Sequence, residues 1–207
     1  MIQIAGPNGC GKTTFYNAFL RPAIESTGKR LVYINADDIA LEMRSRGGTP
    51  LGLDEQLARR AQVEADDQRN QLLLAGHEES VIFETVFSDP DGYRLNFLRR
   101  AKVAGYKVVH IFIAVADVNL SAQRVSQRVA EGGHDVPMAK QVERFGRSLA
   151  NGRAALEIAD LSLFVDNSQP CINKAYSHKL VAVFLGSDPL EVISLPPQWF
   201  RTIHPGV

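Results

Sequence analysis

The sequence predicts an α/β fold in which a central, mostly parallel sheet is flanked by helices. Short apolar segments alternate with helix-compatible segments, the pattern of parallel strands joined by crossover helices. Glycine-rich or acidic residues follow several of the apolar segments directly. Because such sheets bind ligands at the carboxyl ends of their strands, we expect these residues to converge on one cleft.

The N-terminal segment predicts a phosphate-binding P-loop. Apolar residues 2–5 precede a G-x-x-x-x-G-K-T pattern, and residues 13–20 are compatible with a helix that ends before Pro22. A glycine-rich turn that enters a helix N-terminus directs several backbone N–H groups at an anion. Lys12 would reach the β- and γ-phosphates, and the Thr13 hydroxyl would ligate Mg²⁺. The residues expected to bind the nucleotide are Gly6, Pro7, Asn8, Gly9, Cys10, Gly11, Lys12, Thr13 and Thr14.

The later segments continue the alternation within a single domain that we expect to span residues 1–207. Further strands are expected at 31–35, 81–87, 107–115 and 161–166, and helices at 37–44, 54–75, 89–104, 117–131 and 138–159. One or two terminal strands are expected in 178–185 and 190–195, with a loop around 196–199. An arginine-bearing lid is expected at about 124–147.

Composition limits the classes of partner. The chain has 207 residues, of which 45% are hydrophobic, and its 23 basic residues balance its 23 acidic residues. Zero net charge and the lack of a basic stripe argue against a nucleic-acid partner. No apolar run approaches the roughly 18 residues of a membrane span, and no secretory signal is recognisable. Cys10 and Cys171 form neither a disulfide framework nor a metal cluster. We therefore expect a cytoplasmic protein.

Asp37 is the candidate general base. It follows the second predicted strand, and transfer of a phosphoryl group to an alcohol needs a carboxylate within hydrogen-bond reach of the hydroxyl. Asp38, one residue further on, would point elsewhere. The alternative is that either aspartate only caps the following helix.

Other acidic and polar residues are candidate substrate ligands. Glu84 and Thr85 lie in the third predicted strand, where a charge is costly to bury without a partner or a ligand. The alternative for Glu84 is a structural ion pair with an arginine. Glu64 is a further candidate, although a solvated helix face explains it about as well.

Basic residues gather in the expected lid. Arg124 and Arg128 are four residues apart and share one helix face, and the Gly132-Gly133 pair could act as a hinge. Guanidinium groups suit a migrating phosphoryl group, and Arg144 or Arg147 could contribute from beyond the hinge. Ordinary surface arginines are the alternative. His134 is expected to be a lid contact.

With these residues identified, the chain resembles the zeta toxin family of P-loop kinases, in its short single-domain bacterial branch. The P-loop is generic, whereas the FET and GGHDVP segments are more specific. The matching segments, in family order, are GPNGCGKTT (6–14), NADD (35–38), FETVFS (83–88), RVSQRVAEGGHDVP (124–137), RFGRSL (144–149) and VDNS (165–168).

The resemblance implies phosphorylation of a small-molecule hydroxyl by ATP or GTP with Mg²⁺. The family's founding toxins phosphorylate the 3′-hydroxyl of UDP-N-acetylglucosamine, and an antitoxin protein is a possible partner. By position, Asp37 matches the family's catalytic base, Glu84 its strand-end acid and Arg128 a lid arginine, while Lys12 and Thr13 match its Walker residues.

Two departures concern the acceptor. This chain has Glu84-Thr85-Val86 where the toxins have E-G-T, and His134 falls where they have a second lid arginine. Glu64 matches a substrate-binding acid only with altered spacing. The alternatives from other classes are an ATPase or nucleotide switch that acts on a macromolecular partner, and a nucleic-acid kinase.

Overall fold

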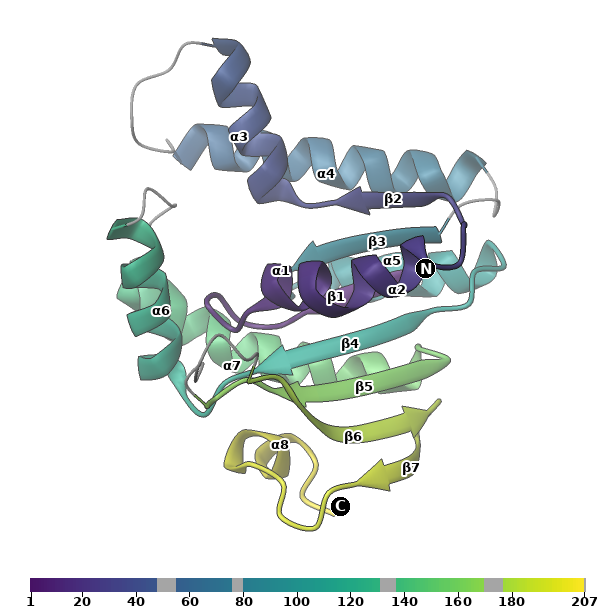
Figure 1. Cartoon of the computed structure of the whole chain (residues 1–207), viewed down its shortest axis with the longest axis vertical. Coiled ribbons are helices and arrows are strands. Elements are labelled where there is room, and N and C mark those ends of the chain that lie inside the picture. The colour runs from purple at the N-terminus through teal and green to yellow at the C-terminus, as the bar shows by residue number, and fades with distance from the viewer. Residues whose placement is uncertain (48–54, 76–79, 131–136, 170–176, 207) are drawn as a thin grey trace.

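The computed structural model describes residues 1–47, 55–75, 80–130, 137–169 and 177–206. It confirms the expected sheet, which carries helices on both faces (Figure 1). The strand order is β2-β3-β1-β4-β5-β6-β7. The first five of these strands are parallel, and the last two pair antiparallel. The strands are β1 (Ile2–Ala5), β2 (Leu31–Ile34), β3 (Ser80–Thr85), β4 (Val109–Ala114), β5 (Leu161–Asp166), β6 (Lys179–Leu185) and β7 (Asp188–Val192).

The order of the strands fixes the place of the binding crevice. Strand β1 lies between β3 and β4, and the chain proceeds from β1 to β2 on one side and later to β4 on the other. A crevice opens where the chain reverses its direction across a parallel sheet, outside the carboxyl ends of the strands. The P-loop follows β1 and lies at this reversal point.

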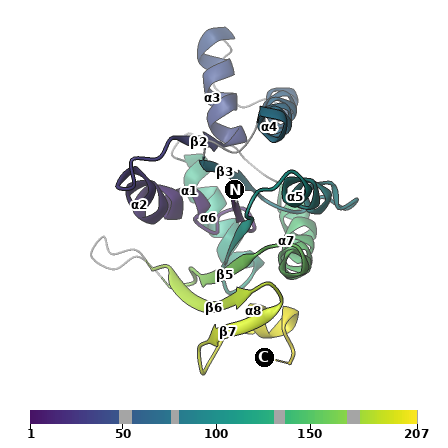
Figure 2. The ribbon, with the colours of Figure 1, turned by 90° about the vertical axis from the view of Figure 1, so that its right-hand side faces the viewer.

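Helices cover both faces of the sheet. In Figure 2, α5 and α7 lie on one face, while α1 and α2 lie on the other. In Figure 1, α6 lies beyond the carboxyl end of β4, and α3 and α4 extend past the β2 edge. The helices are α1 (Lys12–Phe15), the π-helical turn η1 (Tyr16–Leu20), α2 (Arg21–Glu25), α3 (Ala36–Gly47), α4 (Glu55–Ala75), α5 (Tyr93–Val103), α6 (Val118–Ala130), α7 (Met138–Ala154), the 3₁₀ turn η2 (Ala155–Glu157) and α8 (Gln198–Ile203).

Two expectations about the helices were wrong. The helical segment after the P-loop does not end before Pro22, because α1, η1 and α2 follow one another without a gap and Pro22 lies in the first turn of α2. The segment expected to be a loop around 196–199 contains the start of α8. Pro197 caps this helix in an extended conformation, and burial of Trp199 and Phe200 stabilises it.

None of the helices in the described ranges is long and apolar enough to cross a bilayer. The core is divided between the two faces of the sheet, with one apolar cluster around Phe83, Phe112 and Phe164 and another around Ile4, Ile82 and Ile113. Gly152 of α7 lies so close to the sheet that an added Cβ would be 2.6 Å from the Phe112 ring. Helix α7 is therefore a packed part of the body.

His110 of β4 is a fully buried histidine in this core. Its Nδ1 lies 2.9 Å from Gln3 Oε1, and the rings of Phe87, Phe112 and Phe164 surround it at centroid distances of 5.7, 5.9 and 6.2 Å. Burial lowers the pKa of His110 to about 3.

We expect His110 to stay neutral in the folded protein at pH 5. In the unfolded chain its pKa would be about 6.5, so acidification favours unfolding. Above pH 6.5 this group does not change the free energy of unfolding with pH. As the pH falls from 6.5 towards the folded pKa, the free energy of unfolding decreases by about 1.4 kcal/mol per pH unit. The NMR signal of the ring Cε1–H should keep its chemical shift from pH 7 to pH 5. A titration near pH 6.5 in the folded protein would contradict this assignment.

Candidate active site

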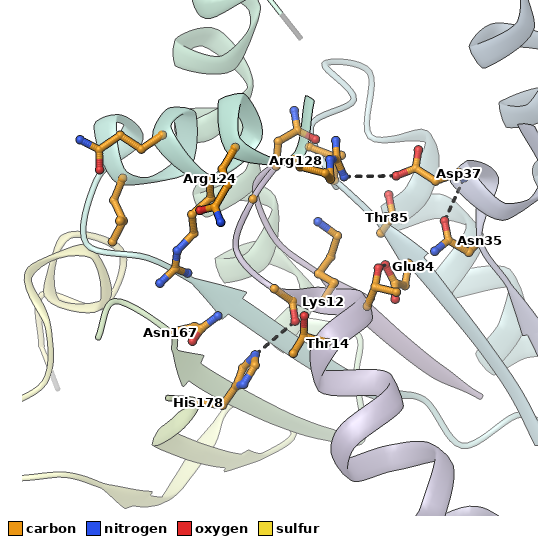
Figure 3. A pocket seen from close by; sticks show the side chains of 18 of the residues that line it. Lys12, Thr14, Asn35, Asp37, Glu84, Thr85, Arg124, Arg128, Asn167 and His178 are labelled. Carbon is orange, nitrogen blue, oxygen red and sulfur yellow. Dashed lines mark hydrogen bonds and ion pairs between the residues drawn. The ribbon is translucent and has the colours of Figure 1, made fainter. Parts of the chain in front are cut away.

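A cavity of about 760 Å³ opens at the carboxyl ends of the parallel strands (Figure 3). The P-loop and α1 line it on one side, and α6 contributes Arg124 and Arg128. The end of β3, the start of α3 and the segments around Asn167 and His178 complete its wall. The convergence expected from the sequence is therefore present.

The P-loop adopts backbone conformations that need glycine. Gly6 and Gly11 have φ angles of +147° and +93°. An added Cβ would lie 1.9 Å from the carbonyl oxygen of Ile113 at Gly6 and 2.4 Å from Asn167 Nδ2 at Gly11. Gly6, Pro7 and Cys10 form the buried underside of the loop, while Asn8, Gly9 and Gly11 line the cavity. Burial also raises the pKa of the Cys10 thiol. A buried thiol of this kind is unreactive, so the Cys10 side chain serves the packing of the loop.

The cavity suits a nucleoside triphosphate. Lys12 Nζ lies above the loop and donates to the carbonyls of Gly6 at 2.9 Å and Pro7 at 3.0 Å. Two polar atoms on the lining residues, Asn8 Nδ2 and His178 Nδ1, are buried and have no hydrogen-bond partner among the described residues. A cationic amine over a glycine turn, at a helix N-terminus with spare polar groups beside it, fits a polyphosphate and its attached nucleoside.

Thr13 and Glu84 form the polar floor of the cavity. Thr13 Oγ1 donates to one Glu84 carboxylate oxygen at 2.9 Å, and the Tyr33 hydroxyl donates to the other at 2.5 Å. Asn35 Nδ2 in turn donates to the Tyr33 hydroxyl at 3.1 Å, and the Tyr33 ring stacks on Tyr16 at 3.7 Å. Burial raises the pKa of Glu84. The alternative of an ion pair with arginine is not seen among the described residues, where the hydroxyl groups of Thr13 and Tyr33 hold Glu84.

This floor also fits a magnesium ion that keeps several of its waters. Among the described residues no group of three or more histidine, cysteine or acidic side chains could hold a metal. Mg²⁺ in nucleotide sites usually takes one or two protein ligands together with phosphate oxygens and water. Thr13 would supply the direct ligand, and the Glu84 carboxylate would accept hydrogen bonds from coordinated waters.

We expect Tyr33→Phe to lower kcat about tenfold while leaving the affinity for ATP within about twofold. The phenyl ring can keep its stacking on Tyr16, but Glu84 loses the donor that fixes one carboxylate oxygen. Steady-state kinetics and calorimetric titration of a non-hydrolysable ATP analogue separate the two effects. An unchanged kcat would remove Tyr33 from the positioning of Glu84.

Asp37 and Arg128 face each other across the cavity (Figure 3). The Arg128 guanidinium lies 3.5 Å from the Asp37 carboxylate, and both side chains are partly exposed. Asp37 lies in the first turn of α3, but the cap of this helix is Asn35, whose Oδ1 accepts the Asp37 backbone N–H at 2.9 Å. The Asp37 carboxylate is thus not needed as the cap. Arg124 donates to the carbonyl of Gln169 at 3.4 Å.

Other expected site residues lie elsewhere. Glu64 is exposed on α4 and hydrogen-bonds Gln68, whereas Gln62 lines the cavity. Positions two apart on a helix differ by about 200° in direction, so both cannot face the cavity. Arg144 and Arg147 of α7 line a neighbouring, smaller cavity instead of the P-loop cavity. His134 and the Gly132-Gly133 hinge lie outside the described residues.

Several residues that line the cavity were not expected, and Asn167 and His178 are the ones that contact the P-loop backbone. Asn167 follows β5 and donates through Nδ2 to the carbonyl of Cys10 at 2.9 Å, a position that the strand-end rule could have indicated. His178 Nε2 lies 3.2 Å from the carbonyl oxygen of Gly11, and its ring lies edge-on to Phe15 and Phe19. Burial lowers the pKa of His178, so the ring is neutral at pH 7. No sequence pattern marks His178.

Solved structures share this fold at low sequence identity. A chain of the AvrRxo1-ORF1:-ORF2 complex with ATP matches with a TM-score of 0.70 and 18% identity, covering 100% of this chain and 64% of that chain. A chain of the PezAT chromosomal toxin–antitoxin system of Streptococcus pneumoniae matches with a TM-score of 0.56 and 18% identity, covering 85% of this chain and 72% of that chain. This chain therefore spans less than two thirds of the AvrRxo1 chain.

A search of curated proteins found no match. The family profile described as Zeta toxin matches residues 1–169, which include the P-loop, Asp37, Glu84 and the arginines of α6. The expected fold and the expected enzyme class, a phosphotransferase, agree with this match. The chain belongs to the zeta toxin family.

Proposed function

We propose that the protein is a kinase that transfers the γ-phosphate of ATP or GTP to a hydroxyl of a small molecule, with a nucleotide sugar such as UDP-N-acetylglucosamine as the acceptor class. The observation that carries the proposal is the position of Asp37. Its carboxylate lies on the wall of the P-loop cavity and faces Arg128. Family membership supports the same reaction.

The proposed reaction is a direct displacement. The acceptor oxygen attacks the γ-phosphorus, its proton passes to the Asp37 carboxylate, and the bond from the γ-phosphorus to the bridging oxygen breaks, releasing the nucleoside diphosphate. Lys12 and the loop N–H groups bind the phosphates, and Arg128 and Arg124 offset the charge of the group in transfer. A bound Mg²⁺ would neutralise phosphate charge beside Thr13.

Partners are part of the proposal. An antitoxin protein is a proposed partner, because the chain belongs to the zeta toxin family and shares its fold with a chain of the PezAT toxin–antitoxin system.

Mass spectrometry of reaction mixtures tests the proposal. The purified protein is incubated with Mg-ATP and a panel of nucleotide sugars and dinucleotides led by UDP-N-acetylglucosamine, with Lys12→Ala as the blank. The expected result is a mass gain of one phosphate on an acceptor, absent from the blank. Formation of ADP with no modified acceptor, in the panel or in cell-extract metabolites, would favour the ATPase or nucleotide-switch alternative.

A further inference from the structure

A second, smaller cavity of about 310 Å³ adjoins the P-loop cavity. Gln62, Thr85 and Val86 line both cavities, so the two cavities adjoin at the end of β3. The smaller cavity lies between the segment that follows β3 and helix α7. Its charged lining residues are Asp89, Arg94, Arg144 and Arg147.

Three guanidinium groups and one carboxylate therefore line this cavity, so its lining carries an excess of positive charge. Arg94 pairs with Asp89 at 3.4 Å, and its Nε is buried with no hydrogen-bond partner in the part of the chain that the structure describes. Arg147 pairs with Glu143 and donates from Nε to the carbonyl of Ser88 at 2.8 Å. Arg144 is half-buried and makes no hydrogen bond or ion pair within the described ranges of the chain. A half-buried guanidinium without a partner is a ready ligand for an anion.

Helix α7 holds the wall of this cavity in place. Ser148 Oγ donates to the carbonyl of Val86 at 2.7 Å, and Asn151 Nδ2 donates to the carbonyls of Phe87 at 3.0 Å and Asp89 at 3.1 Å. Phe87 is fully buried with φ at +58°, a conformation that a bulky residue adopts only where the surroundings impose it. Helix α7, which carries Arg144 and Arg147, is thus held against the end of β3, so its backbone would need little reorganisation when an anion binds.

We infer that the smaller cavity binds a phosphate or pyrophosphate group of the acceptor, with Arg144 as its principal ligand. This inference rests on the proposed function and refines it: the acceptor would present its hydroxyl at Asp37 and extend past Thr85 into the arginine-lined cavity. The acceptor class is then an alcohol that carries its own phosphate or pyrophosphate, and a neutral sugar or nucleoside lacks the group that this cavity recognises.

Kinetics of Arg144→Gln test the inference with the acceptor that the panel identifies. We expect KM for a phosphate-bearing acceptor to rise at least about tenfold, with kcat and KM for ATP within about twofold, because the guanidinium binds a part of the acceptor remote from the reacting atoms. Arg153→Gln is the matched control, since Arg153 lies exposed on the same helix and lines neither cavity. Equal acceptor KM values for the two variants would overturn the inference.

A binding measurement keeps the inference testable if no acceptor is phosphorylated. Inorganic pyrophosphate is titrated calorimetrically, without Mg²⁺, into Lys12→Ala and into Lys12→Ala/Arg144→Gln. We expect binding to the first protein and at least about tenfold weaker binding to the second. Absent binding, or equal binding to both, would overturn the inference. Failure of the wild-type protein to phosphorylate any acceptor would instead count against the proposed function.

Discussion

Asp37→Asn is expected to lower kcat by about 10²- to 10⁴-fold and to leave the affinity for ATP within about twofold. The amide keeps the size of the side chain but cannot accept the proton of the acceptor hydroxyl. Nucleotide binding is expected to depend on Lys12 and the glycine loop, which Asp37 does not contact among the interactions described. Single-turnover kinetics with Mg-ATP and the acceptor measure the first quantity, and calorimetric titration measures the second.

Asp38→Asn is the matched control for this prediction. Asp38 shares the first turn of α3 with Asp37, so both substitutions remove one carboxylate near the same helix N-terminus. Asp38 does not line the cavity, and the phosphotransfer rate of its variant should stay near that of the wild type. If the two variants lost activity equally, the effect would come from the charge of the helix terminus, and Asp37 would not be the base.

The part of the site that follows local rules could be predicted from the sequence. A P-loop needs glycine at fixed positions, so its pattern is visible without knowledge of the fold, and the structure places Gly6 and Gly11 at conformations that only glycine tolerates easily. The carboxyl-end rule likewise predicted that Asp37 and Glu84 would share a cleft with the loop.

The remainder depends on tertiary contacts that no local pattern encodes. His178 reaches the loop because antiparallel β6 begins beside it, and Tyr33 meets Glu84 because β2 pairs with β3. Arg144 was expected to assist the phosphoryl group, but the packing of α7 on the sheet directs it to the smaller cavity. The packing of α4 directs Gln62 to the cavity, and Glu64, two positions along the same helix, therefore points away from it.

Glu84→Gln is expected to lower kcat by about 10²-fold or more while leaving the folded protein at least as stable as the wild type. The amide is close in size to the carboxylate, but it removes the negative charge that accepts hydrogen bonds from Thr13 and Tyr33. Burial raises the pKa of Glu84, so ionisation is harder in the folded chain than in the unfolded chain.

The direction of this pKa shift distinguishes a functional role of Glu84 from a structural one. A carboxyl group with a raised folded pKa stabilises the protein below its unfolded pKa of about 4.3 and loses that contribution as the pH rises, so ionisation of Glu84 disfavours folding. A neutral glutamine removes this penalty. Urea unfolding at pH 7 should therefore give an equal or higher midpoint for the variant, while phosphotransfer at saturating Mg-ATP is nearly lost. A buried charge that lowers the stability of the fold points to a functional role for Glu84. A variant that unfolds more easily and keeps its activity would show instead that Glu84 serves the fold.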